Sequence, residues 1–174
     1  MPGMGDEVTV RPATTGEVQA LPGMQVDAGQ VFRDLGMAMV ADGPEPEVAE
    51  FARAQQRGHL LLALTCGDVV GFVRLEVLDA ALHVEQVTVA PGHGGRGTGR
   101  RLMVAAEALA REQGYDRMTL TAFRDVPFNG PFYESLGWRA VPTRALTPGL
   151  AAARQEEVDA GLDAWPRQAM SRLV

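Results

Sequence analysis

A strand, a glycine-rich loop and a helix follow one another in the middle of this 174-residue chain. Residues 81–90 have the apolar pattern of a strand, five glycines fall within Gly92–Gly99, and the residues up to Gln113 repeat apolar side chains at helical spacing. Met118–Phe123 predicts the next strand. Two strands joined by a helix form a parallel pair with a right-handed crossover, so this segment predicts a sheet with one parallel pair.

The flanking segments predict an antiparallel meander and further helices. Short turns at Cys66-Gly67-Asp68 and Asp79-Ala80 join three consecutive strands antiparallel. The other expected strands are 8–11, 138–141 and a weak 167–173. A capping box at Thr14 and Glu17 predicts a helix that Pro22-Gly23 breaks. The further expected helices are 27–40, 47–57, a short one ending near 137, and 150–160. The predicted fold class is therefore α+β, a mixed, mostly antiparallel sheet with helices on both faces.

The strand over residues 81–90 changes phase in its middle. Leu82 and Val84 are apolar at even positions, whereas Val87 and Val89 are apolar at odd positions. A strand keeps one face inward only while its period stays at two, and a β-bulge shifts that phase by one residue. The slip at Glu85-Gln86 therefore predicts a bulge in the central strand; the alternative is a strand buried on both faces.

Composition excludes several functions. Sixteen basic against 22 acidic residues give a net charge of −6, which argues against nucleic-acid binding. Every basic residue is Arg, so a P-loop lysine and a Schiff-base lysine are excluded. Cys66 is the one cysteine, and the three histidines lack metal-ligand spacing, so no disulfide and no metal site are expected.

The sequence also bears on location. No apolar run approaches the length of a membrane span, and the first ten residues lack the pattern of a secretory signal. A lone cysteine fits a reducing compartment. We therefore expect a cytoplasmic protein without membrane contact.

The glycine loop predicts an anion site. Glycines leave backbone N–H groups uncovered, and the first N–H groups of the following helix lack intrahelical partners, so phosphate or diphosphate can bind there. Arg96, Arg100 and Arg101 add positive charge to an acidic chain. Gly92, Gly94 and Gly97 also satisfy a dinucleotide fingerprint, but the acidic residue it needs would follow the next strand, whereas Asp116 precedes it. We interpret that match as accidental.

Two segments in the correct order resemble the motifs of a known family. V-T-V-A-P-G-H-G-G-R-G-T-G-R-R-L-M at 87–103 resembles the acetyl-CoA-binding motif of the GNAT superfamily of N-acetyltransferases, and F-R-D-V-P-F-N-G-P-F-Y-E-S-L-G-W at 123–138 resembles its Asn and Tyr region. The resemblance implies a GNAT-like single domain over residues 6–174 with the bulge in its central strand. Gly94 departs from the family, which usually has Gln or Arg there.

The resemblance also implies how acetyl-CoA binds. The backbone of Val87, Thr88 and Val89 would pair with the pantetheine arm, and Asn129 would hydrogen-bond that arm. The N–H groups from Gly95 to Arg100 would hold the diphosphate: Gly95, Arg96, Gly97, Thr98, Gly99 and Arg100.

Acetyl transfer to an amine requires a base and stabilisation of the leaving thiolate. An alkylamine has a pKa of about 10.4, so a base must take its proton at neutral pH. Glu85 at the predicted bulge is the first candidate, and His83, expected at the surface, is the second. The resemblance gives Tyr133 the position of a general acid, and a hydrogen bond to the developing sulfur charge is its expected main role.

The predicted function is N-acetyl transfer from acetyl-CoA to a primary amine of a small molecule or peptide, by direct attack in a ternary complex. A non-catalytic acyl-CoA-binding sensor and a nucleotide-phosphate-binding domain are the alternatives, and relatives suggest a homodimer. The acceptor is not identified. Four apolar residues could line its pocket, and the alternative is that they belong to the core: Phe32, Met37, Met39 and Phe51. Glu76 and Asp79 could attract a cation, and the alternative is that they are surface carboxylates without a role.

Overall fold

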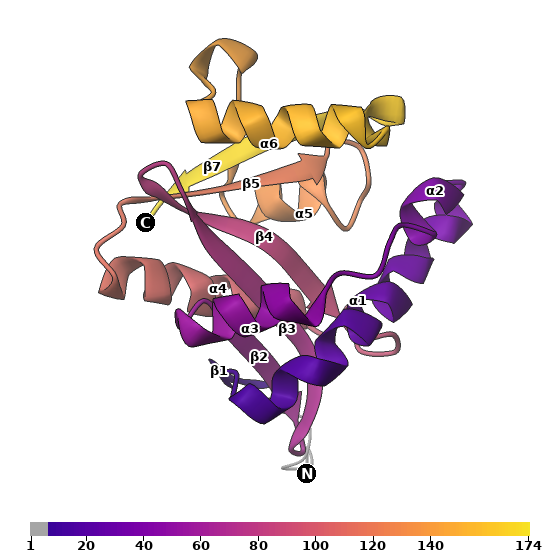
Figure 1. Ribbon diagram of the computed structural model, residues 1–174, viewed down its shortest axis with the longest axis vertical. Coiled ribbons are helices and arrows are strands. Elements are labelled where there is room, and N and C mark those ends of the chain that lie inside the picture. Colours follow the sequence, from indigo (N-terminus) through magenta and orange to yellow (C-terminus); the bar gives the residue numbers. More distant parts are fainter. Residues whose placement is uncertain (1–6) are drawn as a thin grey trace. The chain divides into compact units, whose positions relative to one another are not determined.

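A computed structural model describes residues 7–174 and shows a mixed sheet with helices (Figure 1). The strands are β1 Thr9–Pro12, β2 Leu60–Thr65, β3 Asp68–Leu78, β4 Ala81–Val89, β5 Arg117–Phe123, β6 Arg139–Val141 and β7 Arg167–Leu173, hydrogen-bonded in the order β1-β2-β3-β4-β5-β7-β6. Leu82–Val84 of β4 pairs in parallel with Met118–Leu120 of β5, whereas β1–β2, β2–β3, β5–β7 and β6–β7 are antiparallel. The predicted α+β class is confirmed.

The helices agree with the predictions except near the start of the chain. They are α1 Leu21–Gly29, α2 Ala38–Ala41, α3 Val48–Gln56, α4 Thr98–Glu112, α5 Gly130–Ser135 and α6 Pro148–Asp159, with 3-10 turns η1 Thr15–Ala20, η2 Gln30–Leu35, η3 Thr143–Ala145 and η4 Leu162–Ala164. The break predicted at Pro22-Gly23 is wrong, because Pro22 lies in the first turn of α1, where its missing N–H is not needed.

The continuous helix predicted over residues 27–40 is also wrong. The chain forms α1, then η2, and turns at Gly36 with a φ of 73° before the short α2. Val31, Leu35 and Met39, whose helical spacing led to that prediction, are each close to half exposed. The helical spacing of these side chains therefore does not mark a core stripe.

The chain divides into two compact units, and the first unit contains residues up to Leu75 together with Gln86–Ala106. Its core packs η1, α1 and α3 against β2 and β3, with buried members Ala13, Val18, Leu21, Phe51, Ala54, Leu60, Leu62, Leu64 and Phe72. Phe51 and Phe72 meet edge to face with 5.3 Å between ring centroids. Phe51 is fully buried, so it belongs to the core and not to an acceptor pocket.

Helix α4 covers the other face of this unit's strands. A Cβ added at Gly71 of β3 would lie 3.4 Å from Cδ1 of Leu102 in α4, and 2.6 Å from the carbonyl oxygen of Thr88 in β4. Gly71 adjoins Phe72 in β3, whose side chain points into the core formed with α3, so the two residues face opposite ways. The first unit thus has helices on both faces.

The pairing of β2 with β3 contains a shift of register. Leu64 pairs with Val69 and Ala63 pairs with Gly71, which leaves Val70 as one extra residue in β3. The bulge predicted at Glu85-Gln86 stays a prediction. The first four residues of β4, residues 81–84, are all buried, so both faces of that strand are covered there.

The second unit contains Glu76–Glu85 and Glu107–Val174. Strand β7 lies between β5 and β6 and pairs with β5 from Arg117↔Leu173 to Phe123↔Arg167. The sequence predicted only a weak final strand here; its seven residues instead occupy an interior position in the sheet of their own chain. No helix within residues 7–174 is long and apolar enough to cross a membrane.

Candidate functional site

The glycine loop before α4 is open on its surface. Gly92, Gly95 and Gly97 have φ values of 83°, 71° and 80°, a region that side-chain-bearing residues rarely adopt. A Cβ added at any of these three glycines, or at Gly94, would meet no atom within 4 Å. A ligand can therefore approach this backbone closely.

The start of α4 supplies donors to the same place. The N–H of Arg101 donates to the Gly97 carbonyl at 3.0 Å, so the N–H groups of Thr98, Gly99 and Arg100 precede the first intrahelical hydrogen bond. Arg96 and Arg100 are exposed. This arrangement fits a diphosphate, as the sequence predicted.

Arg101 does not add its charge to the loop as the sequence suggested. Its Nη1 donates to the carbonyl oxygen of Val8 at 3.1 Å, at the start of β1. Arg101 thus fastens the first strand to α4, and Arg96 and Arg100 are the cations that remain at the loop.

The end of β4 carries the backbone predicted to pair with the pantetheine arm. Thr88 is buried, and Val87 and Val89 are partly exposed. Nε2 of Gln86 donates to the Val87 carbonyl at 3.1 Å and to Oγ1 of Thr88 at 3.2 Å. A carbonyl has two lone pairs, so the contact with Gln86 does not by itself saturate the Val87 carbonyl.

In the second unit, Asn129 fixes the end of β5. Its Oδ1 accepts a hydrogen bond from the Phe123 N–H at 2.7 Å, so the side-chain NH₂ group carries the donors available for a ligand. The backbone of Gly130, the first residue of α5, lies so close to Arg124 that an added Cβ would be 2.7 Å from the Arg124 carbonyl oxygen. The tight approach explains why glycine opens α5.

Tyr133 is buried within aromatic neighbours. It is 7% exposed, and its ring meets those of Phe132 and Trp138 at centroid distances of 5.1 and 6.2 Å. Burial raises the pKa of the Tyr133 phenol to about 12, and the charge of Arg167 opposes that rise. An ordinary thiol has a pKa of about 8.5, so full proton transfer from Tyr133 to a thiolate would be uphill by about 5 kcal/mol.

Three side chains of the second unit form what we call the glutamate–histidine cluster: Glu76 near the end of β3, and His83 and Glu85 of β4. One ligand atom from each lies within 4.8 Å of the others. His83 is 3% exposed, so the surface histidine expected from the sequence is wrong. Its Nε2 lies 3.8 Å from Oε2 of Glu85, and its Nδ1 lies 2.8 Å from Oγ1 of Thr119 in β5.

Burial favours the neutral form of His83. Burial lowers its pKa below the ordinary value, while the charges of Glu85 and Glu157 act in the opposite direction. The imidazole is therefore uncharged at neutral pH, and Nε2 can accept a proton or a hydrogen bond.

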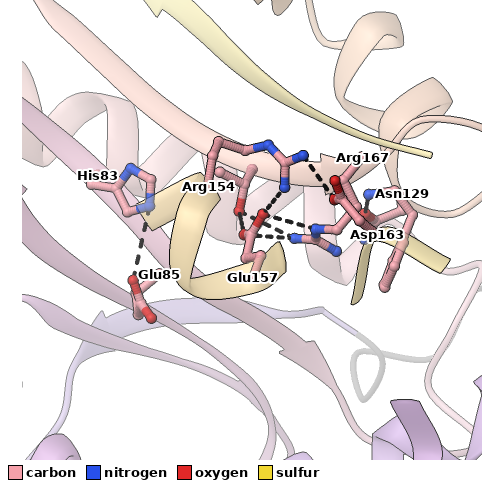
Figure 2. A network of polar contacts seen from close by, with 9 residues as sticks. His83, Glu85, Asn129, Arg154, Glu157, Asp163 and Arg167 are labelled. Atoms are coloured by element: carbon pink, nitrogen blue, oxygen red, sulfur yellow. Dashed lines mark hydrogen bonds and ion pairs between the residues drawn. The ribbon is translucent and has the colours of Figure 1, made fainter. Parts of the chain in front are cut away.

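A second polar group, centred on Glu157 of α6, joins that helix to the sheet (Figure 2). The Glu157 carboxylate accepts hydrogen bonds from Arg154, from Thr121 of β5, and from Nε and Nη2 of Arg167 at 3.0 and 2.9 Å. The Arg167 guanidinium also lies 4.2 Å from the centroid of the Phe123 ring. These contacts hold the pKa of Glu157 below its usual range, against the effect of burial.

Sequence reasoning missed Thr119, Arg154, Glu157 and Arg167. The spacing of Arg154 and Glu157 indicates a helical ion pair, but no local signal connects α6 with β5 and β7. Asp79, expected to attract a cation, instead accepts the Gly149 N–H at 3.1 and 3.2 Å. Of the apolar acceptor-pocket candidates, Met37 is buried and Met39 is 46% exposed.

Residues 29–138 match the model of the acetyltransferase (GNAT) family. The chain therefore belongs to the GNAT acetyltransferase family, as its two motifs suggested.

Curated relatives match over part of their length. Streptothricin acetyltransferase of Streptomyces lavendulae is 37% identical over 93 residues, which cover 52% of this chain and 46% of that protein. N-alpha-acetyltransferase 80 of Mus musculus is 46% identical over 74 residues, which cover 41% of this chain and 22% of that protein. The alignments thus span less than half the length of either relative.

Solved structures match almost the whole fold. An acetyltransferase of the GNAT family from Staphylococcus aureus Mu50 has a TM-score of 0.72 at 14% identity, covering 96% of this chain and 99% of that chain. The PaiA N-acetyltransferase of Thermoplasma acidophilum, solved in complex with coenzyme A, has a TM-score of 0.70 at 14% identity, covering 97% and 99%.

Proposed function

We propose that this chain is an N-acetyltransferase that transfers the acetyl group of acetyl-CoA to a primary amine by direct attack. The open glycine loop ahead of α4 carries the proposal, because its uncovered N–H groups and exposed Arg96 and Arg100 suit the diphosphate of coenzyme A. Membership of the family and the coenzyme A bound by the PaiA structure support the choice of ligand.

The cosubstrate is held mainly by backbone groups in this proposal. N–H groups from Gly95 to Arg100 bind the diphosphate, the backbone of residues 87–89 pairs with the pantetheine arm, and the NH₂ group of Asn129 donates to that arm. The Asn129 carbonyl already holds the end of β5, so its amide orientation is set before the ligand arrives.

Glu85 and His83 supply the base. The amine must lose a proton to attack the thioester, and both side chains present lone pairs within one cluster. The Glu85 side chain is 38% exposed, so solvent reaches it, whereas His83 is enclosed. We therefore assign the proton transfer to Glu85, directly or through water, with His83 beside it.

Tyr133 stabilises the leaving sulfur by hydrogen bonding. Its pKa of about 12 makes complete proton donation costly, and a donor aimed at developing charge lowers the barrier without transferring its proton. We expect Tyr133→Phe to lower kcat about tenfold, with the Kd of acetyl-CoA within about threefold of the parent value. Unchanged turnover would remove Tyr133 from the mechanism.

The test of the function combines binding and turnover. Calorimetry should show acetyl-CoA binding to the purified chain, and thiol release should follow when amines are added as a panel. Tight binding without turnover by any amine would instead support the acyl-CoA sensor. Nucleotide binding without coenzyme A binding would support a nucleotide-phosphate domain.

We propose a cytoplasmic enzyme that needs no metal, and a homodimer, which sedimentation of the purified protein tests directly. β7 pairs within its own sheet between β5 and β6, so a dimer would form without exchange of that strand.

A further inference from the structure

We propose that Arg167, held by Glu157, is a positioning residue for acetyl transfer: it fixes the end of β5, from which Asn129 takes the orientation of its amide. The inference rests on the proposed function, in which Asn129 donates to the pantetheine arm and Tyr133 hydrogen-bonds the leaving sulfur. It extends that site to a residue near the end of the chain, which the sequence did not single out.

The Arg167 side chain covers the last residue of β5. Thr119, Thr121 and Phe123 alternate along that strand, so their side chains point to one face. Phe123 pairs directly with Arg167 of β7, and directly paired residues share a face. The guanidinium carbon of Arg167 lies 4.2 Å from the centroid of the Phe123 ring, well within the range of a cation–π contact.

Glu157 fixes the plane of the Arg167 guanidinium (Figure 2). Nε and Nη2 of Arg167 donate to the two carboxylate oxygens at 3.0 and 2.9 Å, and Nη2 also donates to Oγ1 of Thr121 at 3.2 Å. A bidentate pair of this kind sets orientation as well as position. The side chains of Arg167 and Glu157 are 9% and 15% exposed, so water competes little for these contacts. The pair therefore holds the guanidinium against the Phe123 ring.

The backbone of Phe123 connects this ring to the proposed site. Its N–H donates to Oδ1 of Asn129 at 2.7 Å, which sets the direction of the Asn129 NH₂ group. The backbone carbonyl of Asn129 in turn accepts the N–H of Tyr133 at 3.1 Å, in the first turn of α5. A displacement of Phe123 would therefore move both the amide of Asn129 and the turn that carries Tyr133.

The charge of Arg167 acts on the same group. Burial raises the pKa of the Tyr133 phenol, and the positive charge of Arg167 opposes that rise. A nearby cation strengthens the phenol as a donor toward negative charge that develops on a leaving sulfur. Contact and charge thus favour the same role for Arg167.

Arg154 of α6 offers a matched control. It donates to the same Glu157 carboxylate and also, through Nη2, to Asp163 at 2.9 Å. Removal of either arginine leaves Glu157 with the other, so both changes disturb the ion-pair network. Among the described residues, the cation over the Phe123 ring belongs to Arg167 and not to Arg154.

The experiment compares Arg167→Met with Arg154→Met. We measure kcat and the KM of acetyl-CoA by thiol release, with the amine of the panel that turns over fastest, and the Kd of 3′-phospho-ADP by calorimetry. This nucleotide is the part of coenzyme A without the pantetheine arm, so in our proposal it engages the glycine loop and not Asn129.

For Arg167→Met we expect kcat to fall about tenfold and KM to rise about fivefold, with the nucleotide Kd within about twofold of the parent value. Arg154→Met should stay within about twofold of the parent in all three. Arg167→Lys keeps a cation over the ring but loses the bidentate pair, so its kcat should be about threefold below the parent. A kcat for Arg167→Lys no higher than that of Arg167→Met would overturn the inference.

Three other outcomes would also overturn it. They are unchanged kinetics in Arg167→Met, equal losses in the two Met variants, and a nucleotide Kd that rises together with KM. Thermal unfolding checks the fold of each variant. If Arg167→Met does not fold, Phe123→Leu takes its place, because it removes the ring and keeps the ion pairs; we expect kcat about fivefold lower, and an unchanged kcat would overturn the inference. No thiol release by the parent protein with any amine would instead refute the proposed function, on which the inference rests.

Discussion

The glycine loop and the glutamate–histidine cluster are built in opposite ways. The loop presents backbone N–H groups from consecutive residues of one segment, with glycines at φ values near 80° that leave the backbone open. The cluster contains side chains from β3 and β4, next to a hydroxyl of β5. A local backbone site depends on conformation, whereas an assembled side-chain site depends on chemical identity and pairing of strands.

The comparison predicts different sensitivities. In the loop, a change of side chain is tolerated wherever the backbone angle survives. In the cluster, an isosteric change that removes one charge alters function while the fold stays intact. Single substitutions in the loop and in the cluster test this difference.

Glu85→Gln should have the largest effect. The amide keeps the size of the side chain but cannot take a proton, so we expect kcat to fall about 1,000-fold, within the range of general-base catalysis. The Kd of acetyl-CoA should stay within about twofold, since Glu85 is not in the loop. A kcat within tenfold of the parent value would assign the proton transfer elsewhere.

Gly97→Val should have the next largest effect, and on binding. A β-branched residue at the observed φ of 80° costs about 2–3 kcal/mol, so the Kd of acetyl-CoA should rise about 100-fold. Gly94→Ala is the control, because its φ is not positive and an added Cβ meets nothing within 4 Å. We expect its Kd within about threefold. Equal losses in both variants would show that side-chain volume, not backbone angle, governs the loop.

Glu17→Gln tests a local feature distant from both sites in the sequence. Hydrogen bonds from Arg11 and then from the Thr14 N–H lower the pKa of Glu17 to about 2. Because the folded pKa lies below the unfolded one, this stability is present above about pH 4.5 and is lost as the pH falls toward 2. We expect a loss of about 1 kcal/mol at pH 7 by chemical unfolding, since the pair is partly exposed. Glu7→Gln should change stability by less than about 0.5 kcal/mol.

His83→Gln should give the smallest effect, on the pH dependence of stability. Burial lowers the pKa of folded His83 below its unfolded value, so the unfolded chain binds more protons as the pH falls below about 6.5. The free energy of unfolding of the parent protein should therefore fall over that range. That of the variant should fall less, and the two losses should differ by under about 1 kcal/mol. Superimposable pH profiles in urea unfolding would contradict a buried neutral imidazole.

Local patterns predicted most of the elements. The loop, α4 and its flanking strands lie close to their expected bounds, because glycine position and apolar spacing act over short distances. The capping pair of Thr14 and Glu17 also forms in part, with the Thr14 N–H donating to the Glu17 carboxylate at 2.8 Å. It opens a 3-10 turn and not the α-helix expected.

The errors occurred where local preference competes with tertiary packing. Helical spacing at residues 31–39 did not produce a buried face, since the core of the first unit takes its helical side chains from η1, α1 and α3. β7 looked weak because its sequence is polar at Arg167, Gln168, Ser171 and Arg172; pairing on both sides makes it an interior strand.

The sequence by itself determined the family and the fold class, and it predicted the open backbone of the glycine loop, because glycines between a strand and a helix constrain the chain locally wherever they occur. Only the tertiary structure decided that His83 is buried, that Thr119 orients it, and that Glu76 joins it with Glu85. Those side chains come from β3, β4 and β5, and the register of paired strands, not the spacing of residues along the chain, brings them together.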